Sequence, residues 1–186
     1  MLDNILNPKL PWQVILQDKM NSYREEDYSL EYPDEEYLPN MYIPTLHSEG
    51  MGNINIYVDT SGSVSKEQIN IAITEINNLK HTINPRLISL ISFDTEIHTQ
   101  NTFTCDDLLE AKDINLRGGG GTCLKEVSKH IIKHNPELIL IITDGLVSTI
   151  PLHTLDIDLI WIIQNNSKFT CSKGTIIHIK DTNYDN

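Results

Sequence analysis

Short apolar segments alternate with amphipathic ones along the chain from residue 53 onward. Five of the apolar segments have the length and the Ile, Leu and Val content of buried strands: 53–58, 87–93, 138–143, 159–163 and 175–179. Between them, apolar residues recur at helical spacing from Ile69 to Ile83 and from about Cys123 to His134. This alternation predicts an α/β fold, in which a doubly wound, mostly parallel sheet carries helices on both faces.

Two further elements are expected beside the second strand. The segment 96–103 follows a turn at 94–95 and is expected to pair as one antiparallel edge strand. A short helix is expected over 104–111, because Thr104 and Asp107 are suited to open one.

Residues 1–50 differ in composition from the domain predicted at 51–186. They contain ten acidic and three basic residues, five of the seven tyrosines and five of the eight prolines. An apolar stripe predicts a helix at about 12–20. Beyond it the sequence is too rich in proline for regular structure, so we expect an acidic, extended arm whose tyrosines and Ile43 pack on the domain. Two interpretations of its acids stay open, a solvated linker and a docking strip for a basic partner.

The whole chain has 186 residues and a formal net charge of −12. That length suits one domain with a sizeable core. No apolar run reaches membrane-spanning length and no basic stripe suits a phosphate backbone, so neither a membrane nor nucleic acid is an expected partner. Cys105, Cys123 and Cys171 are an odd number without a CxxC pair, which favours reduced thiols in a cytoplasmic protein.

Three polar loops lie at the edge of the predicted sheet where such folds bind ligands. They are 59–63 (DTSGS) after the first strand, 118–122 (GGGGT) before the second helix, and 143–145 (TDG) after the third strand. Ligands of open α/β sheets bind beyond the carboxyl ends of strands, where the strand order reverses. If the strands before the first and third loops are neighbours, their two acids meet at one edge and Thr122 can approach them.

The oxygen-bearing side chains of these loops form a candidate metal site: Asp59, Ser61, Ser63, Thr122 and Asp144. Two carboxylates and three hydroxyls, without Cys or His, suit a hard divalent cation, Mg²⁺ first and Mn²⁺ or Ca²⁺ as alternatives. Hydroxyls are weak, neutral ligands, so the ion would stay electrophilic, and an acidic side chain of another protein would complete its coordination. Each loop alone is also typical of an ordinary turn, and only the combination indicates a site.

The three loops, in this order, resemble the metal-ion-dependent adhesion site of von Willebrand factor A (VWA) domains. The resemblance covers most of the chain and is closest to the VWA-like domain that follows a metallopeptidase-like domain in bacterial and phage proteins. It implies that the first loop supplies the ligands Asp59, Ser61 and Ser63. It also implies that the second loop supplies Thr122 and that Asp144 binds through water.

Smaller features extend the resemblance: Pro11-Trp12, residues 43–46, Phe93-Asp94 and Trp161. The chain also departs from the family pattern at two places. Cys123 stands where an acid is expected after the threonine, which puts metal affinity or ligand choice in doubt, and Arg24-Glu25 stands where a basic pair is expected.

The resemblance implies partners as well. Proteins of this kind look like companions of MoxR-type AAA+ ATPases, and related chains carry a peptidase-like domain upstream, which needs an HExxH helix. This chain lacks that motif, since residues 130–134 read HIIKH. Cys123, His130 and His134 lie near one side of the second predicted helix. We interpret them as surface residues beside its apolar stripe rather than as a soft-metal site.

Three functional hypotheses stay open. In the first, the metal site makes the chain a protein-binding module without catalysis, and a partner's carboxylate caps the ion. In the second, a hydrolase or phosphotransferase uses the same ion to activate water, which requires a general base near the ion. The sequence places no His beside the three loops, so binding is favoured over catalysis. In the third, the domain is degenerate and binds no metal.

Overall fold

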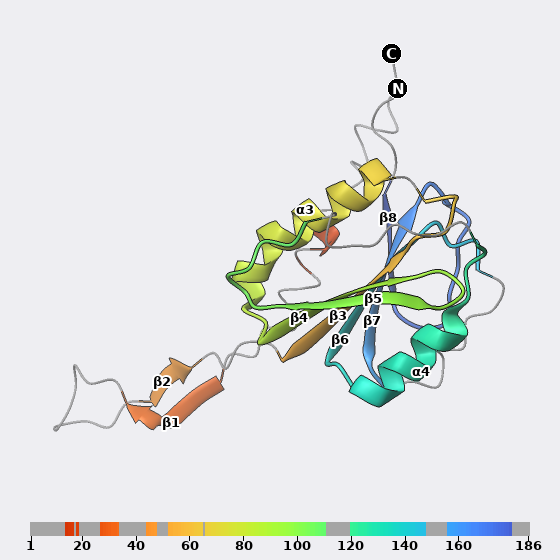
Figure 1. Ribbon diagram of the computed structural model, residues 1–186. Coiled ribbons are helices and arrows are strands. Elements are labelled where there is room, and N and C mark those ends of the chain that lie inside the picture. Colours follow the sequence, from red (N-terminus) through yellow and green to blue (C-terminus); the bar gives the residue numbers. More distant parts are fainter. Residues whose placement is uncertain are drawn as a thin grey trace, which may run out of the picture.

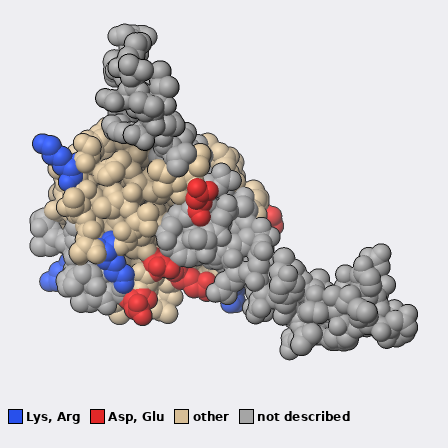
Figure 2. Space-filling model, turned by 180° about the vertical axis from the view of Figure 1, so that it is seen from behind, with Lys and Arg blue, Asp and Glu red and all other residues tan. Residues whose placement is uncertain are grey.

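The computed structural model (Figure 1) describes residues 14–16, 18, 27–33, 44–47, 52–64, 66–110, 120–147 and 156–179. Within these residues, no helix combines the length and the apolar character needed to cross a membrane. On the face shown in Figure 2, the Lys and Arg side chains are scattered, and acidic side chains gather mainly toward its lower part.

A six-stranded sheet forms the centre of the molecule, in the spatial order β5-β4-β3-β6-β7-β8 (Figure 1). Its strands are β3 (Asn53–Asp59), β4 (Leu87–Phe93), β5 (Ile97–Phe103), β6 (Leu138–Thr143), β7 (Asp158–Gln164) and β8 (Thr175–Ile179). In this sheet β4 and β5 pair antiparallel, and the other neighbouring strands pair parallel. The predicted α/β class is therefore confirmed, with its one antiparallel edge strand.

Burial explains the composition of these strands. Every residue of β6 is buried, and so are six of the seven in β3 and in β7. A strand covered on both faces reads as a continuous apolar run rather than as an alternation. The edge strand β5 is mostly polar, and all its residues are exposed or partly exposed, which discourages pairing with other chains.

Two helices cover opposite faces of the sheet, α3 (Lys66–Ile83) and α4 (Leu124–His134) (Figure 1). Successive residues of β3 show the division: Ile56 belongs to the core cluster under α3, whereas Tyr57 belongs to the cluster under α4. Helix α3 ends before Asn84, as predicted, where the backbone turns left-handed with φ of 45°.

The helix predicted over 104–111 is wrong for its described part, 104–110, which contains no helix. Asp107 Oδ2 accepts hydrogen bonds from the amide and the hydroxyl of Thr104, at 2.7 and 2.8 Å. These two hydrogen bonds close a turn. The side chain of Asn77 on α3 hydrogen-bonds to both backbone groups of Leu109. It donates to the Leu109 carbonyl at 2.7 Å and accepts a hydrogen bond from the Leu109 amide at 3.0 Å. A side chain distant in sequence thus replaces the helical hydrogen bonds.

The expectation that the proline-rich arm lacks regular structure is also wrong. The strands β1 (Asp27–Pro33) and β2 (Pro44–His47) form a separate antiparallel sheet. Pro33 pairs with Pro44 at the ends of these strands, after an irregularity in register. Proline lacks a backbone donor but is tolerated at strand ends and edges, which is where both prolines lie. The side chains of this arm, whose packing on the domain was predicted, lie outside the described residues.

The predicted N-terminal helix is described at residues 14–16 and 18, which are helical. Leu16 is fully buried there and belongs to the core cluster under α3, together with Ile54 and Ile76.

Replacing Asn77 by Ala should lower the free energy of unfolding by about 1–3 kcal/mol, because the backbone groups of Leu109 lose their partner. Asn78→Ala is the matched control, since Asn78 is the exposed neighbour on the same helix. Urea unfolding of both variants measures the difference. Equal stability of the two would show that the contact does not hold residues 104–110 to α3.

Candidate metal site

The candidate site lies where β3 and β6 end. These two strands are parallel neighbours, with Val58 opposite Ile142, as the sequence reasoning required. Their carboxyl ends therefore lie at the same edge of the sheet, and Asp59 and Asp144 are brought to that edge together. Asp59 is fully buried and Asp144 is 8% exposed.

The first loop folds around the Asp59 carboxylate. The Ser61 amide donates to Asp59 Oδ1 at 2.9 Å, and the Ser61 and Ser63 hydroxyls lie 3.3 Å apart. A backbone hydrogen bond of 3.1 Å from Val64 to Ser61 closes the loop just before α3. Such Asx-type turns follow from the short acidic side chain. They leave Ser61 buried and Ser63 exposed.

The second loop brings Thr122 to the same carboxylate. The Thr122 hydroxyl donates to Asp59 Oδ2 at 3.0 Å. The backbone on either side is held as well, because Thr122 forms an isolated parallel bridge with Val147 and the Cys123 amide donates to the Asp94 carbonyl at 2.8 Å. The structure thus brings four predicted ligands into one hydrogen-bonded group: Asp59, Ser61, Ser63 and Thr122.

The third loop holds Asp144 by different means. Asp144 Oδ1 accepts the Leu146 amide at 2.9 Å, and Asn166 in the β7–β8 loop donates to the Asp144 carbonyl at 3.0 Å. Gly145 has φ of +73°, and a Cβ atom there would lie 2.5 Å from the ring of Phe169, so glycine is required. The loop is therefore fixed from the β7–β8 side, with Asp144 at the sheet edge beside Asp59.

Sequence reasoning missed Thr143, the last residue of β6. Its hydroxyl donates to Asp59 Oδ2 at 2.6 Å and accepts the Gly145 amide at 3.1 Å. The available signal was a polar residue that ends an otherwise apolar buried strand. Asn166 was missed too, and it had no comparable signal because its contact depends on the β7–β8 loop.

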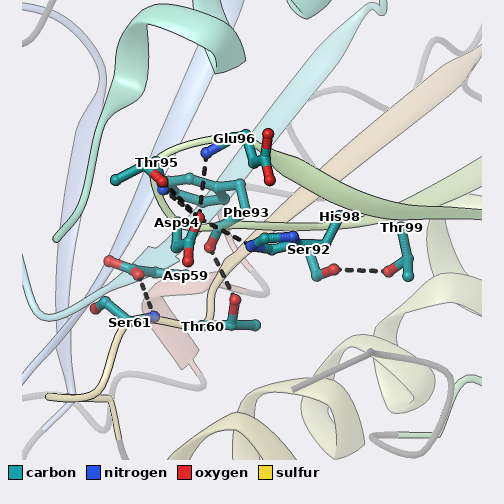
Figure 3. Close-up of polar contacts among 10 residues, drawn as sticks. All are labelled: Asp59, Thr60, Ser61, Ser92, Phe93, Asp94, Thr95, Glu96, His98 and Thr99. Carbon is teal, nitrogen blue, oxygen red and sulfur yellow. Dashed lines mark hydrogen bonds and ion pairs between the residues drawn. The ribbon is translucent and has the colours of Figure 1, made fainter. Parts of the chain in front are cut away.

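Asp94 forms a turn at the edge of the same group (Figure 3). Its Oδ1 accepts the amides of Thr95 and of Glu96, the latter at 3.1 Å. His98 Nε2 lies 2.8 Å from the same oxygen but lacks hydrogen-bond geometry. Burial raises the pKa of the Asp94 carboxyl, but the amides and the His98 ring outweigh burial and hold that pKa below its usual value. Asp94 is thus the turn former that the sequence suggested.

The charge at the sheet edge suits a cation. Among the described residues, neither Asp59 nor Asp144 forms an ion pair. No group of three His, Cys, Asp or Glu side chains gathers as a metal cluster in the same part of the chain. The candidate site has only two such residues, and its remaining oxygens are hydroxyls. Two carboxylates and three hydroxyls are an oxygen set that fits Mg²⁺, Mn²⁺ or Ca²⁺.

The Cys123, His130 and His134 set does not form a soft-metal site. The Tyr57 hydroxyl lies 2.9 Å from His130 Nδ1. It also accepts a hydrogen bond from the side-chain amide of Asn55. His130 Nε2 lies 3.1 Å from Gln100 Oε1, and the His134 ring stacks on His130 at 4.0 Å. His130 is therefore half-buried and hydrogen-bonded, rather than a free surface residue.

The three thiols are free. Cys105, Cys123 and Cys171 form no disulfide and are each partly exposed. The reduced state that the sequence indicated stays a prediction.

A cavity of about 510 Å³ lies at the opposite edge of the sheet. It is lined by residues that precede or begin β6 and β7, with one lysine from the β7–β8 loop: Asn135, Pro136, Glu137, Asp156, Ile157, Asp158 and Lys173. This cavity is separate from the candidate metal site, because parallel strands carry their two ends to opposite edges.

The chain belongs to the VWA-like domain (DUF2201) family, whose family model matches residues 54–180. Domains of this kind are generally protein-interaction modules. The resemblance to VWA-like domains is therefore confirmed, while the adhesion-type metal site and the link to metallopeptidases stay predictions.

The chain is also similar to two solved structures. One is the ArnB paralog VWA2 from Sulfolobus acidocaldarius, with 23% identity and a TM-score of 0.49 over 62% of this chain and 35% of that chain. The other is the conserved hypothetical protein BatB from Bacteroides thetaiotaomicron, with 17% identity and a TM-score of 0.46 over 60% of this chain and 66% of that chain. No curated protein sequence matches the chain.

The His130 contacts predict a pH dependence of stability. Burial, followed by the charges of His134 and Lys133, lowers the pKa of His130 from 6.5 to about 4. Between these two values the unfolded chain binds a proton at His130 and the folded chain does not, so the free energy of unfolding falls as the pH falls. Urea unfolding at pH 7 and pH 4.5 should show a smaller fall for His130→Gln than for the wild type.

His81→Gln serves as the control, since His81 is an exposed histidine on α3. It should still lose stability on acidification, because His130 and its contacts are kept. If His130→Gln loses stability on acidification as steeply as the wild type, the contacts of His130 do not favour its neutral form.

Proposed function

We propose that this chain is a divalent-metal-dependent protein-binding module. In this proposal, the ion is held by the five oxygen-bearing residues of the three loops: Asp59, Ser61, Ser63, Thr122 and Asp144. The ion is Mg²⁺, with Mn²⁺ or Ca²⁺ as substitutes, and an acidic side chain of the partner protein completes its coordination.

The observation that carries the proposal is a pair of buried acids without a cationic partner in the described residues. Asp59 is fully buried and Asp144 is nearly so. Asp59 ends β3, and Asp144 directly follows β6, the parallel neighbour of β3. Burying carboxylates is unfavourable unless a cation or several hydrogen bonds compensate. Hydroxyl and amide donors surround Asp59, and a divalent ion would neutralise the charge that remains.

The outer side of the site supports the binding of a large partner. Gly62, Ser63 and Gly121 are exposed, and a Cβ atom on Gly121 would meet nothing within 4 Å. Leu146, two residues after Asp144, exposes 68% of its surface beside the third loop. A carboxylate side chain can thus approach the ion from solvent, and Leu146 offers an apolar contact next to it.

For the partner we keep the expectation drawn from the family resemblance. The proposed partner is a protein that presents an Asp or Glu side chain, such as a MoxR-type AAA+ ATPase in the cytoplasm of a bacterium or in a phage-infected cell. A metallopeptidase-like companion domain is the second candidate. The general role of VWA-like domains as interaction modules agrees with either.

The alternative of a metal-dependent hydrolase or phosphotransferase gains little from the contacts near the site. It requires a general base directed at the ion. His98 is the histidine beside Asp94, but it approaches the oxygen that already holds the Thr95 and Glu96 amides. In Figure 3, Asp94 lies between His98 and Asp59. These contacts favour a role of His98 in the β4–β5 turn, and therefore favour binding over catalysis.

Asp144→Asn should separate the contribution of metal binding to stability from that of the fold itself. The variant keeps the Oδ1 acceptor for Leu146 but removes one of two neighbouring charges, so without metal it should be at least as stable as the wild type. Mg²⁺ at about 100 times its Kd should stabilise the wild type by about 2.7 kcal/mol and the variant far less. Thermal unfolding in EDTA and in Mg²⁺ gives both comparisons.

Asp106→Asn is the matched control, because it removes the same charge from an exposed turn. It should gain as much from Mg²⁺ as the wild type does. An equal gain in Asp144→Asn, or no gain in the wild type, contradicts the proposed site.

The partner is tested by affinity capture in the presence of Mg²⁺. The wild type should retain a protein that EDTA releases, and Asp59→Asn should retain none. Turnover of a phosphate ester that requires Mg²⁺ and disappears in Asp144→Ala would instead establish the enzymatic alternative.

A further inference from the structure

The Thr143 hydroxyl has a fixed direction. It is fully buried, lies 2.6 Å from Asp59 Oδ2 and 3.1 Å from the Gly145 amide nitrogen. An amide N–H only donates and a carboxylate only accepts. The hydroxyl therefore accepts from Gly145 and gives its one proton to Asp59.

Two hydroxyls contact the same carboxylate oxygen, and they differ in burial and in their other hydrogen bonds. Thr122 lies 3.0 Å from Asp59 Oδ2, is partly exposed and belongs to the glycine-rich loop. Thr143 is buried at the end of β6 and is held from its other side by Gly145. A hydroxyl that binds a metal ion uses an oxygen lone pair for it. Thr143 is fully buried and has already given one of its two lone pairs to the Gly145 amide, whereas Thr122 is partly exposed and accepts no hydrogen bond from the described residues.

The Thr143 contacts also join two of the loops that carry predicted ligands. Asp59 belongs to the first loop, and Gly145 follows Asp144 directly in the third. One hydroxyl thus links the orientation of the Asp59 carboxylate to the backbone beside Asp144. Asp59 ends β3 and Asp144 directly follows β6, so this link adds to strand pairing in fixing the two acids relative to each other.

We propose that Thr143 is the positioning residue of the metal site, which orients Asp59 and ties it to the loop of Asp144 so that both acids face one ion. Thr143 itself does not bind the ion. Residues that hydrogen-bond to metal ligands orient them, and their loss weakens metal affinity by roughly tenfold to a hundredfold. This inference rests on the proposed metal-dependent function.

The test compares Thr143→Val with Thr143→Ser in the full chain, by calorimetric titration with Mn²⁺ and with Mg²⁺. Val keeps the size and shape of Thr but lacks the hydroxyl, so the affinity should fall roughly tenfold to a hundredfold. Ser keeps the hydroxyl and should restore most of the affinity. If Thr143→Val does not fold, Thr143→Ala removes the same hydroxyl with a smaller side chain, and the same loss of affinity is expected.

Ser92→Ala is the control for the loss of a buried hydroxyl. Ser92 is on β4, next to β3, and its hydroxyl lies 2.6 Å from that of Thr99 rather than near the acids. Ser92→Ala should lower the midpoint of thermal unfolding by the same amount with and without EDTA, and it should leave the metal affinity unaltered.

The outcomes separate the two proposals. If the wild type binds neither ion, the proposed metal-dependent function fails, and the inference fails with it. If the wild type binds and Thr143→Val binds equally well, Thr143 only stabilises the fold, and the positioning role alone is overturned. A similar loss in Ser92→Ala would also overturn it, because the effect would then follow from lost stability.

Discussion

The carboxylate of Asp59 connects three loops, the most distant of which lies 84 residues away in the sequence. Its oxygens accept hydrogen bonds from Ser61, Thr122 and Thr143, one donor from each loop. A buried charge without partners would strongly oppose folding, so these contacts constrain where each loop can lie. The arrangement of the whole sheet edge follows from satisfying this one acid.

The sheet makes that constraint possible. Because β3 lies beside β6 at the centre of the sheet, the ends of two apolar strands bring Asp59 and Asp144 together. The helices α3 and α4 begin just after the first two loops, and their apolar faces cover opposite sides of the sheet. The fold thus places a buried apolar core beneath a polar edge that opens to solvent. This combination suits an interaction module of the VWA-like family.

Local patterns were sufficient to predict the sheet, whereas long-range contacts decided what was missed. The run LILIIT predicts a buried central strand because burial on both faces demands it. No helix forms at 104–110 because Asn77, distant in sequence, holds the backbone of Leu109. The unexpected arm strands form because residues 27–29 pair with residues 45–47. Three loops at strand ends indicated the candidate ligands, but Thr143 looked like the end of a strand. Its role depends on the direction of a buried hydroxyl, which a residue pattern does not contain.

The most direct test of the central claim is to locate the ion with paramagnetic Mn²⁺ in NMR spectra of the full chain. Substoichiometric Mn²⁺ should first broaden the amide signals of Ser61, Thr122 and Gly145, because each lies in a loop that meets Asp59. Signals of Glu137 and Lys173, which line the acidic cavity at the opposite edge, should stay sharp. Broadening that begins at that cavity, or that is uniform over the chain, would contradict a metal site at the ends of β3 and β6.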